Sequence, residues 1–360
     1  MNRLNMQSMR WVAIVAAGLS VACHSVHPER RADASASRQQ ALGRLISDLQ
    51  RDSTHDLKGV MVVRAGRPVV EMYFNGDGPD TLHDMRSAGK SITSMLAGIA
   101  LDRHLIANVD ETLGHLVPRL NGTPAGGTTL RACLTMRTGL DADDVDSLSV
   151  GNERRLDESS DWLAFAGTVP RTHPQDERYL YASLNAFLAG AAVEQAAHMP
   201  LSAFADQALF RPLGITRYSW RRGPRGEGVG QGNLKLRLRD MVKLGELFLH
   251  DGTYNGTRVV SSAWVHASLA PIVPTGGTID RYADAYGYLW YLKRYDVGGD
   301  SVTVHFASGN GGNKIYIVPQ YDLVVAVSSS AYGSSYGQRR SETILRQVLA
   351  SMQHGATANH

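Results

Sequence analysis

Short β-strand patterns occupy both ends of this 360-residue chain, and helical patterns fill its middle. Near the start, two runs rich in β-branched and aromatic residues flank Ala65-Gly66, which predicts a hairpin. Near the end, segments 301–307, 314–319 and 322–330 predict three further strands. Strands from the two chain ends can join in one antiparallel sheet, with the helical segment inserted between them. We therefore expect an α+β fold with its default ligand pocket where two lobes meet.

The length and charge of the chain narrow the possible partners. The formal net charge is only +3, and the basic residues are scattered, which argues against a nucleic-acid partner. The length suffices for one large domain or two modest ones, and for a sizeable core. We place this domain at residues 38–353, divided into an α/β lobe (38–80 and 258–353) and a helical lobe (81–257), with a tail at 354–360.

The N-terminal residues predict export. Residues 1–22 contain two arginines followed by an apolar run that is too short to span a bilayer, as in a signal peptide. Cleavage before Cys23 resembles a bacterial lipoprotein signal, and a lipid on Cys23 would anchor the protein to a membrane. Ordinary signal cleavage after Ala22 is the alternative. Residues 23–37 are small and polar and predict a tether. The expected location is the bacterial periplasm or a membrane-anchored state.

Ser87 and Lys90 lie three residues apart in the segment MRSAGKSITS. The apolar residues from Ile92 to Ile99 have helical spacing, so a helix is expected to begin near Ser87. Positions i and i+3 share a helix face, so the Lys90 amine can approach the Ser87 hydroxyl. A desolvated lysine has a depressed pKa and can act as the base that a serine nucleophile needs. Ser-x-x-Lys also arises by chance, and the alternative is a solvated lysine.

The segment 85–120 resembles the serine-active β-lactamase-like family. This family includes class C β-lactamases, penicillin-binding-protein-type peptidases and related esterases and amidases. The resemblance continues in segments 128–141, 204–215, 236–256 and 308–327, and it covers about residues 40–352. It implies a β-lactamase/transpeptidase-like fold and a nucleophilic serine at Ser87, with no cofactor.

The second motif of this family is a tyrosine followed two residues later by Ser or Asn. Tyr181-Ala182-Ser183 matches it, with Asn185 close behind. The resemblance implies that Tyr181 reaches the serine–lysine pair and shuttles a proton, and that Ser183 and Asn185 bind substrate. Tyr179 is a competitor for the tyrosine, but the sequence that follows favours Tyr181. Without the resemblance, a tyrosine at a helix start usually serves packing.

The third family motif, Lys-Thr-Gly, is absent. Asn310-Gly311-Gly312 takes its place, followed by Asn313. The resemblance implies that these residues bind substrate, that Gly311 and Gly312 let the acyl group lie close to the strand, and that the N–H groups of Ser87 and Asn313 form an oxyanion hole. Asn310 is uncharged, which argues against tight binding of a substrate carboxylate. The pattern is more similar to the esterases and the 6-aminohexanoate-dimer-hydrolase-like amidases.

Four other features have simpler interpretations. The acidic run 141–146 lacks the spacing of a calcium loop and predicts a solvated loop. The glycine-rich run 226–232 does not fit G-x-G-x-x-G, and the resemblance implies a loop near the cleft whose glycines serve backbone geometry. His305 is expected in the core or on a strand face, and Cys133 as a small buried hydrophobe. The histidines show no metal-binding spacing, so no metal site is predicted.

The sequence therefore predicts an exported serine hydrolase that cleaves a small-molecule ester or amide. Ser87 forms an acyl-enzyme, Lys90 takes its proton, and Tyr181 takes part in the relay. A β-lactamase or D,D-peptidase of the same family is one alternative. A non-catalytic binding lipoprotein on a hydrolase scaffold is another, although the intact Ser87, Lys90 and Tyr181 argue against it. The loops that would form the pocket walls carry no pattern that identifies the substrate.

Overall fold

A computed structural model describes residues 40–276 and 281–352. The predicted export signal, tether, tail and lipidated Cys23 lie outside these residues. No helix in the described part of the chain is both long and apolar enough to cross a membrane.

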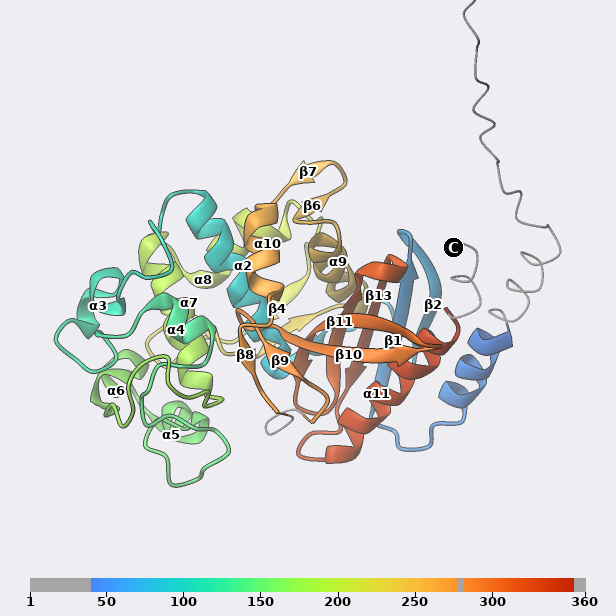
Figure 1. Cartoon of the computed structure of the whole chain (residues 1–360), viewed down its shortest axis with the longest axis horizontal. Coiled ribbons are helices and arrows are strands. Elements are labelled where there is room, and N and C mark those ends of the chain that lie inside the picture. The colour runs from blue at the N-terminus through green and yellow to red at the C-terminus, as the bar shows by residue number, and fades with distance from the viewer. Residues whose placement is uncertain (1–39, 277–280, 353–360) are drawn as a thin grey trace, which may run out of the picture.

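The sheet joins the two ends of the domain, as predicted. It has eight antiparallel strands in the order β2-β1-β13-β12-β11-β10-β9-β8, so the first strands pair with the last (Figure 1). Ala65 and Gly66 both have positive φ, as a two-residue hairpin turn requires. The strands are β1 (Leu57–Arg64), β2 (Arg67–Tyr73), β8 (Val273–Pro274), β9 (Ala285–Tyr286), β10 (Tyr291–Val297), β11 (Asp300–Gly309), β12 (Asn313–Val318) and β13 (Leu323–Ser329).

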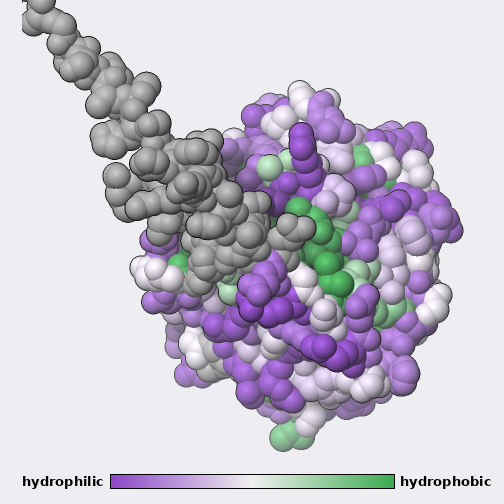
Figure 2. All heavy atoms as spheres, turned by 90° about the vertical axis from the view of Figure 1, so that its right-hand side faces the viewer, coloured by the Kyte–Doolittle hydropathy of each residue, from purple (hydrophilic) through white to green (hydrophobic). Residues whose placement is uncertain are grey.

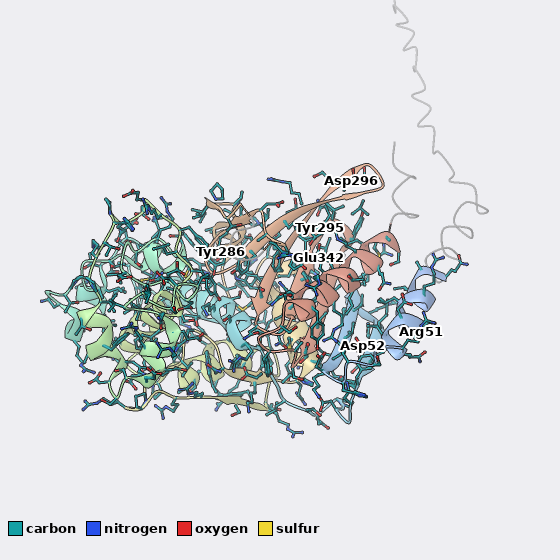
Figure 3. The ribbon with its side chains drawn as sticks, turned by 90° about the horizontal axis from the view of Figure 1, so that it is seen from below. Arg51, Asp52, Tyr286, Tyr295, Asp296 and Glu342 are labelled. Carbon is teal, nitrogen blue, oxygen red and sulfur yellow. The ribbon has the colours of Figure 1, made fainter. Side chains whose placement is uncertain are left out.

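Two helices, α9 (Leu238–Leu249) and α11 (Ser335–Ala350), cover opposite faces of the sheet. Gly245 of α9 lies so close to Ile315 and Val324 that a Cβ at Gly245 would fall within 3.0 Å of both side chains. Glu342 of α11 accepts a 2.6 Å hydrogen bond from Tyr295 of β10, on the other face (Figure 3). Successive side chains of a strand point to opposite faces, and the pairing register places Ile315 and Tyr295 on different ones.

Most of the helices between β2 and α9 form the second lobe, at the left of Figure 1. The prediction that this lobe runs to residue 257 is wrong, because α9 packs on the sheet. Besides α9 and α11, the helices include α2 (Gly89–Asp102), α3 (Leu113–Leu116), α4 (Leu130–Leu134), α5 (Glu153–Glu158), α6 (Trp162–Thr168), α7 (Ser183–Ala196), α8 (Leu201–Ala205) and α10 (Ser262–Leu269). Three short strands, β3 (His83–Asp84), β4 (Tyr218–Trp220) and β5 (Leu234–Leu236), pair beside them, and β6 (Thr253–Tyr254) and β7 (Thr257–Arg258) form a separate hairpin.

Helix α2 lies between the lobes and is buried on every side over its first twelve residues. Its small residues allow this, since a Cβ at Gly98 would fall 2.1 Å from Trp264 of α10. The Trp264 indole N–H also donates a 3.0 Å hydrogen bond to the Ser94 carbonyl. Helix α2 is therefore held firmly, and the residues at its start are held with it. The end of the molecule at the right of Figure 1 has a mostly hydrophilic visible surface, with a narrow hydrophobic strip near its centre (Figure 2).

Candidate active site

Ser87 lies in a tight turn between β3 and α2. The turn begins at Arg86, whose φ of 52° is in the left-handed region, and the Arg86 N–H donates a 2.8 Å hydrogen bond to the Asp84 carboxylate. Residues 86–88 form one 3₁₀ turn that leads into α2 at Gly89. A side chain at Gly89 would fall 3.1 Å from the backbone of Gly232, so the glycine-rich loop presses directly on this turn. The backbone strain and the flanking loop fix the position of the serine.

Lys90 is buried beside Ser87, as the i, i+3 spacing predicts. Its ammonium nitrogen lies 3.0 Å from the Ser87 hydroxyl, 3.0 Å from the Ser183 hydroxyl and 3.0 Å from the Gln231 carbonyl oxygen. Only 2% of the residue is exposed. Three acceptors match the three protons of an ammonium group. The geometry therefore suits a charged lysine that donates to the serine.

The predicted depression of the Lys90 pKa is wrong. Burial by itself would lower this pKa, but the electrostatic interactions of Lys90 with Tyr181, Glu153 and Asp144 outweigh the effect of burial, so the pKa is raised. The ammonium nitrogen lies 5.0 Å from the centroid of the Tyr181 ring. Lys90 therefore stays protonated at neutral pH in the resting site.

Two of the three predicted residues of the second motif, Tyr181 and Ser183, lie beside Ser87 or Lys90. Tyr181 lines the cavity together with Ser87, and Ser183 is fully buried beside Lys90. Asn185 does not face the cavity, because its side-chain oxygen accepts a 3.0 Å hydrogen bond from Thr138 inside the helical lobe. The structure therefore places Asn185, a predicted substrate-binding residue, away from the cavity. The competing tyrosine, Tyr179, packs edge-on against Tyr286 instead of lining the cavity.

The last residues of β11 form the wall opposite Ser87. Ser308, Gly309 and Asn310 line the cavity. A Cβ at Gly309 would fall 2.1 Å from the Met85 carbonyl oxygen and 3.1 Å from the Ala88 nitrogen. Only a glycine at this position lets the strand lie against the nucleophile turn.

The three residues after Asn310 serve a different purpose from the one predicted. Gly311 and Gly312 have φ near 90°, and a Cβ at Gly312 would fall 2.3 Å from the Gly337 carbonyl oxygen of α11. Asn313 is fully buried in β12, and its side chain donates to the carbonyls of Asn310 (2.8 Å) and Ser329 (2.9 Å). None of the three lines the cavity. The structure thus places these three predicted substrate-contact residues outside the cavity lining, where they build the turn that holds Asn310.

The cavity lies at the lobe junction and has a volume of about 320 Å³. Three tyrosines contribute to it, and Arg281 is the one charged side chain among its described lining residues. His305 does not line it. Burial lowers the pKa of His305 to about 4, in keeping with the predicted strand-face position. The lining residues are Ser87, Tyr181, Arg281, Tyr282, Tyr291, Ser308, Gly309, Asn310, Ser335 and Gln338.

The glycine-rich loop 226–232 and the acidic loop 141–146 both contact the site. The glycine-rich loop does so through the Gln231 carbonyl, as its predicted place near the cleft suggests. The acidic loop 141–146 was expected to be solvated, but its Asp144 carboxylate accepts a 2.6 Å hydrogen bond from the Ser183 N–H. No spacing signal distinguishes Asp144 from its acidic neighbours. Among the described residues, no group of three His, Cys, Asp or Glu side chains is placed to hold a metal ion.

Comparison with known proteins identifies the family. The Beta-lactamase family matches residues 44–349, so the chain belongs to this family. A 6-aminohexanoate-dimer hydrolase from Paenarthrobacter ureafaciens is 24% identical over 315 residues, which cover 84% of this chain and 78% of that protein. Both the predicted family and the predicted fold are thereby confirmed.

Solved structures show the same fold at low sequence identity. A class C β-lactamase from Rhodobacter sphaeroides matches with a TM-score of 0.63 and 20% identity, over 87% of this chain and 99% of that one. EstCE1, described as a hydrolase with promiscuous acyltransferase activity, matches with a TM-score of 0.69 and 13% identity, over 89% of this chain and all of that one. The chain is a member of a family of hydrolases.

Proposed function

We propose that this protein is a serine hydrolase that cleaves an ester or amide bond through an acyl-enzyme on Ser87. The observation that carries the proposal is the 3.0 Å contact between the buried Lys90 ammonium and the Ser87 hydroxyl, in a cavity that Tyr181 also lines. A serine hydroxyl needs an activating partner to act as a nucleophile, and this arrangement supplies one.

The arrangement supports a specific proton path. The Ser87 oxygen attacks the substrate carbonyl, and its proton passes to the oxygen of Tyr181, which accepts it as a phenolate and becomes a phenol. Lys90 is held as an ammonium, so it stabilises negative charge on Tyr181 instead of accepting the proton itself. Tyr181 then returns the proton to the leaving group as the bond to it breaks. Water attacks the acyl-enzyme by the same route in reverse and releases Ser87.

The N–H groups of Ser87 and Asn310 suit the role of an oxyanion hole. Neither donates a hydrogen bond to another residue in the described part of the chain. Asn310 adjoins Gly309, which lies against the turn that carries Ser87. Two such donors stabilise the negative charge that develops on the carbonyl oxygen in the transition state. We therefore assign the second donor to Asn310 in place of Asn313.

The relatives favour amide and ester substrates. One is a 6-aminohexanoate-dimer hydrolase, and another is described as a hydrolase with acyltransferase activity. A β-lactamase is the second candidate, because the fold also matches a class C β-lactamase. The uncharged Asn310 at the end of β11 favours the ester or amide substrate. Hydrolysis of nitrocefin faster than of simple esters would instead favour the β-lactamase.

Turnover of p-nitrophenyl butyrate tests the proposal. The Ser87→Ala variant should lose hydrolysis, because no other group in the proposed path can form the acyl-enzyme. Ser219→Ala is the matched control, since Ser219 is exposed on β4 and does not line the cavity. Equal hydrolysis by wild type and Ser87→Ala would contradict the proposal.

We also propose that the chain is exported and anchored by a lipid on Cys23. The support is the sequence of residues 1–22 alone, with its short apolar run that ends directly before this cysteine. Cells that express the full chain should incorporate labelled palmitate into the wild type and not into Cys23→Ala. A protein that is released unlabelled, with cleavage after Ala22, would contradict lipidation.

A further inference from the structure

Asp144 is hydrogen-bonded to the Tyr181–Ser183 motif through both its side chain and its backbone. Its carboxylate accepts a 2.6 Å hydrogen bond from the Ser183 N–H, and its own N–H donates a 2.9 Å hydrogen bond to the Tyr181 carbonyl. The other carboxylate oxygen accepts a 2.8 Å hydrogen bond from the N–H of Glu153, the first residue of α5. One side chain thus joins the acidic loop, the helix α5 and the segment that contains Tyr181 and Ser183.

The same carboxylate acts on Lys90 through its charge. The charged or titratable groups that face Lys90 are Tyr181 beside α7, Glu153 on α5 and Asp144 on the acidic loop. Burial raises the pKa of Asp144, and the Lys90 ammonium opposes this effect. Buried charges in proteins are paired or hydrogen-bonded, and the Asp144 carboxylate accepts two backbone hydrogen bonds and interacts with the Lys90 ammonium. The Ser183 residue that Asp144 holds through its N–H also accepts a hydrogen bond from Lys90 through its hydroxyl.

We propose that Asp144 is a positioning residue of the active site, which fixes the Tyr181–Ser183 segment against Lys90 and places a carboxylate close to the lysine. This inference rests on the proposed function. Asp144 does not line the cavity, so it acts on substrate only through Tyr181, Ser183 and Lys90. The acidic loop thereby has a role in the reaction that its composition does not indicate.

The charge part of the proposal predicts a change in pH dependence. Activity that needs the Lys90 ammonium is lost when the pH rises past the pKa of Lys90. Removal of a neighbouring negative charge makes the ammonium less favourable, so this alkaline limb moves to lower pH. Loss of packing alone would lower the rate at every pH and leave the limb in place.

The experiment is the pH profile of kcat/KM for p-nitrophenyl butyrate, with spontaneous hydrolysis subtracted. Asp144→Asn keeps the shape of the side chain and removes its charge, and its alkaline limb should move down by about 1 to 3 pH units. Asp144→Glu keeps the charge, so its limb should stay near that of the wild type while its rate falls. Asp146→Asn, in the same loop and exposed, should match the wild type.

Two results would overturn the inference. One is an unmoved alkaline limb in folded Asp144→Asn, and the other is identical pH profiles for the Asn and Glu variants. If Asp144→Asn does not fold, Glu153→Gln is the alternative variant, because it removes the adjacent charge without breaking a hydrogen bond to Tyr181 or Ser183. The alkaline limb of Glu153→Gln should move in the same direction. An unmoved limb in this variant would also overturn the inference. Labelling of wild-type Ser87 by a fluorophosphonate distinguishes failure of this inference from failure of the proposed function. If wild-type Ser87 is not labelled, the proposed function itself is refuted.

Discussion

Replacement of Gly309 by alanine tests whether β11 builds the oxyanion hole by pressing on the nucleophile turn. The added Cβ would lie 2.1 Å from the Met85 carbonyl oxygen, where real Cβ contacts begin near 3.0 Å. The strand and the turn must then separate by about 0.9 Å, which moves the Asn310 N–H away from Ser87. A displacement of about 1 Å in a catalytic group, or the loss of one oxyanion donor, costs about 10²-fold to 10³-fold in rate.

The assay is kcat/KM for p-nitrophenyl butyrate, measured beside urea denaturation. Overpacking should lower the free energy of unfolding by about 1–3 kcal/mol, which leaves the protein folded in the assay. Gly78→Ala is the matched control, because nothing lies within 4 Å of a Cβ there and the backbone is unstrained. Gly309→Ala with wild-type kcat/KM would refute the reasoning, since it would show that the contact between strand and turn does not set the catalytic geometry.

Three further predictions concern stability and reactivity. Burial lowers the pKa of His305 from 6.5 to about 4. About 3 kcal/mol of folding stability that is present above pH 6.5 should therefore be lost as the pH falls to 4. Urea denaturation of His305→Gln should show a flatter dependence of the unfolding free energy on pH. Arg340→Ala should lower the free energy of unfolding by about 3 kcal/mol, because it breaks a largely buried ion pair to Asp52 at 3.1 Å. Arg51→Ala, which removes a surface ion pair, should change the free energy of unfolding by less than about 1 kcal/mol. Cys133 should resist iodoacetamide in the native protein and react after unfolding, since burial raises the pKa of its thiol; labelling of the native state would contradict its buried position.

The features that could be predicted from the sequence are those set by local periodicity. The Ser87–Lys90 contact follows from the i, i+3 geometry of a helix start, and the hairpin at Ala65-Gly66 follows from turn chemistry. The strands at both chain ends follow from alternating β-branched residues, and they pair as expected. Each of these patterns spans only a few residues, so the sequence contains the whole signal.

The features that could not be predicted depend on residues brought together from distant segments. Asp144 reaches Ser183 across 39 positions, and no spacing separates it from the other acids of its loop. Whether Asn310 or Asn313 faces Ser87 depends on the residue at which β11 ends and the chain turns into β12. A difference of three residues in this position decides which backbone N–H is exposed. The pKa of Lys90 depends on Tyr181 and on the carboxylates of Glu153 and Asp144, which come from separate segments, so burial alone predicts the wrong direction of the shift.

The central claim is that Ser87 carries the acyl group. Intact-protein mass spectrometry after mixing the enzyme with a fluorophosphonate, followed by peptide mapping, tests it directly. One label per chain, located on Ser87 and absent from Ser87→Ala, is the predicted result. A label on another residue, or an unchanged mass for a folded wild-type protein, would contradict the account.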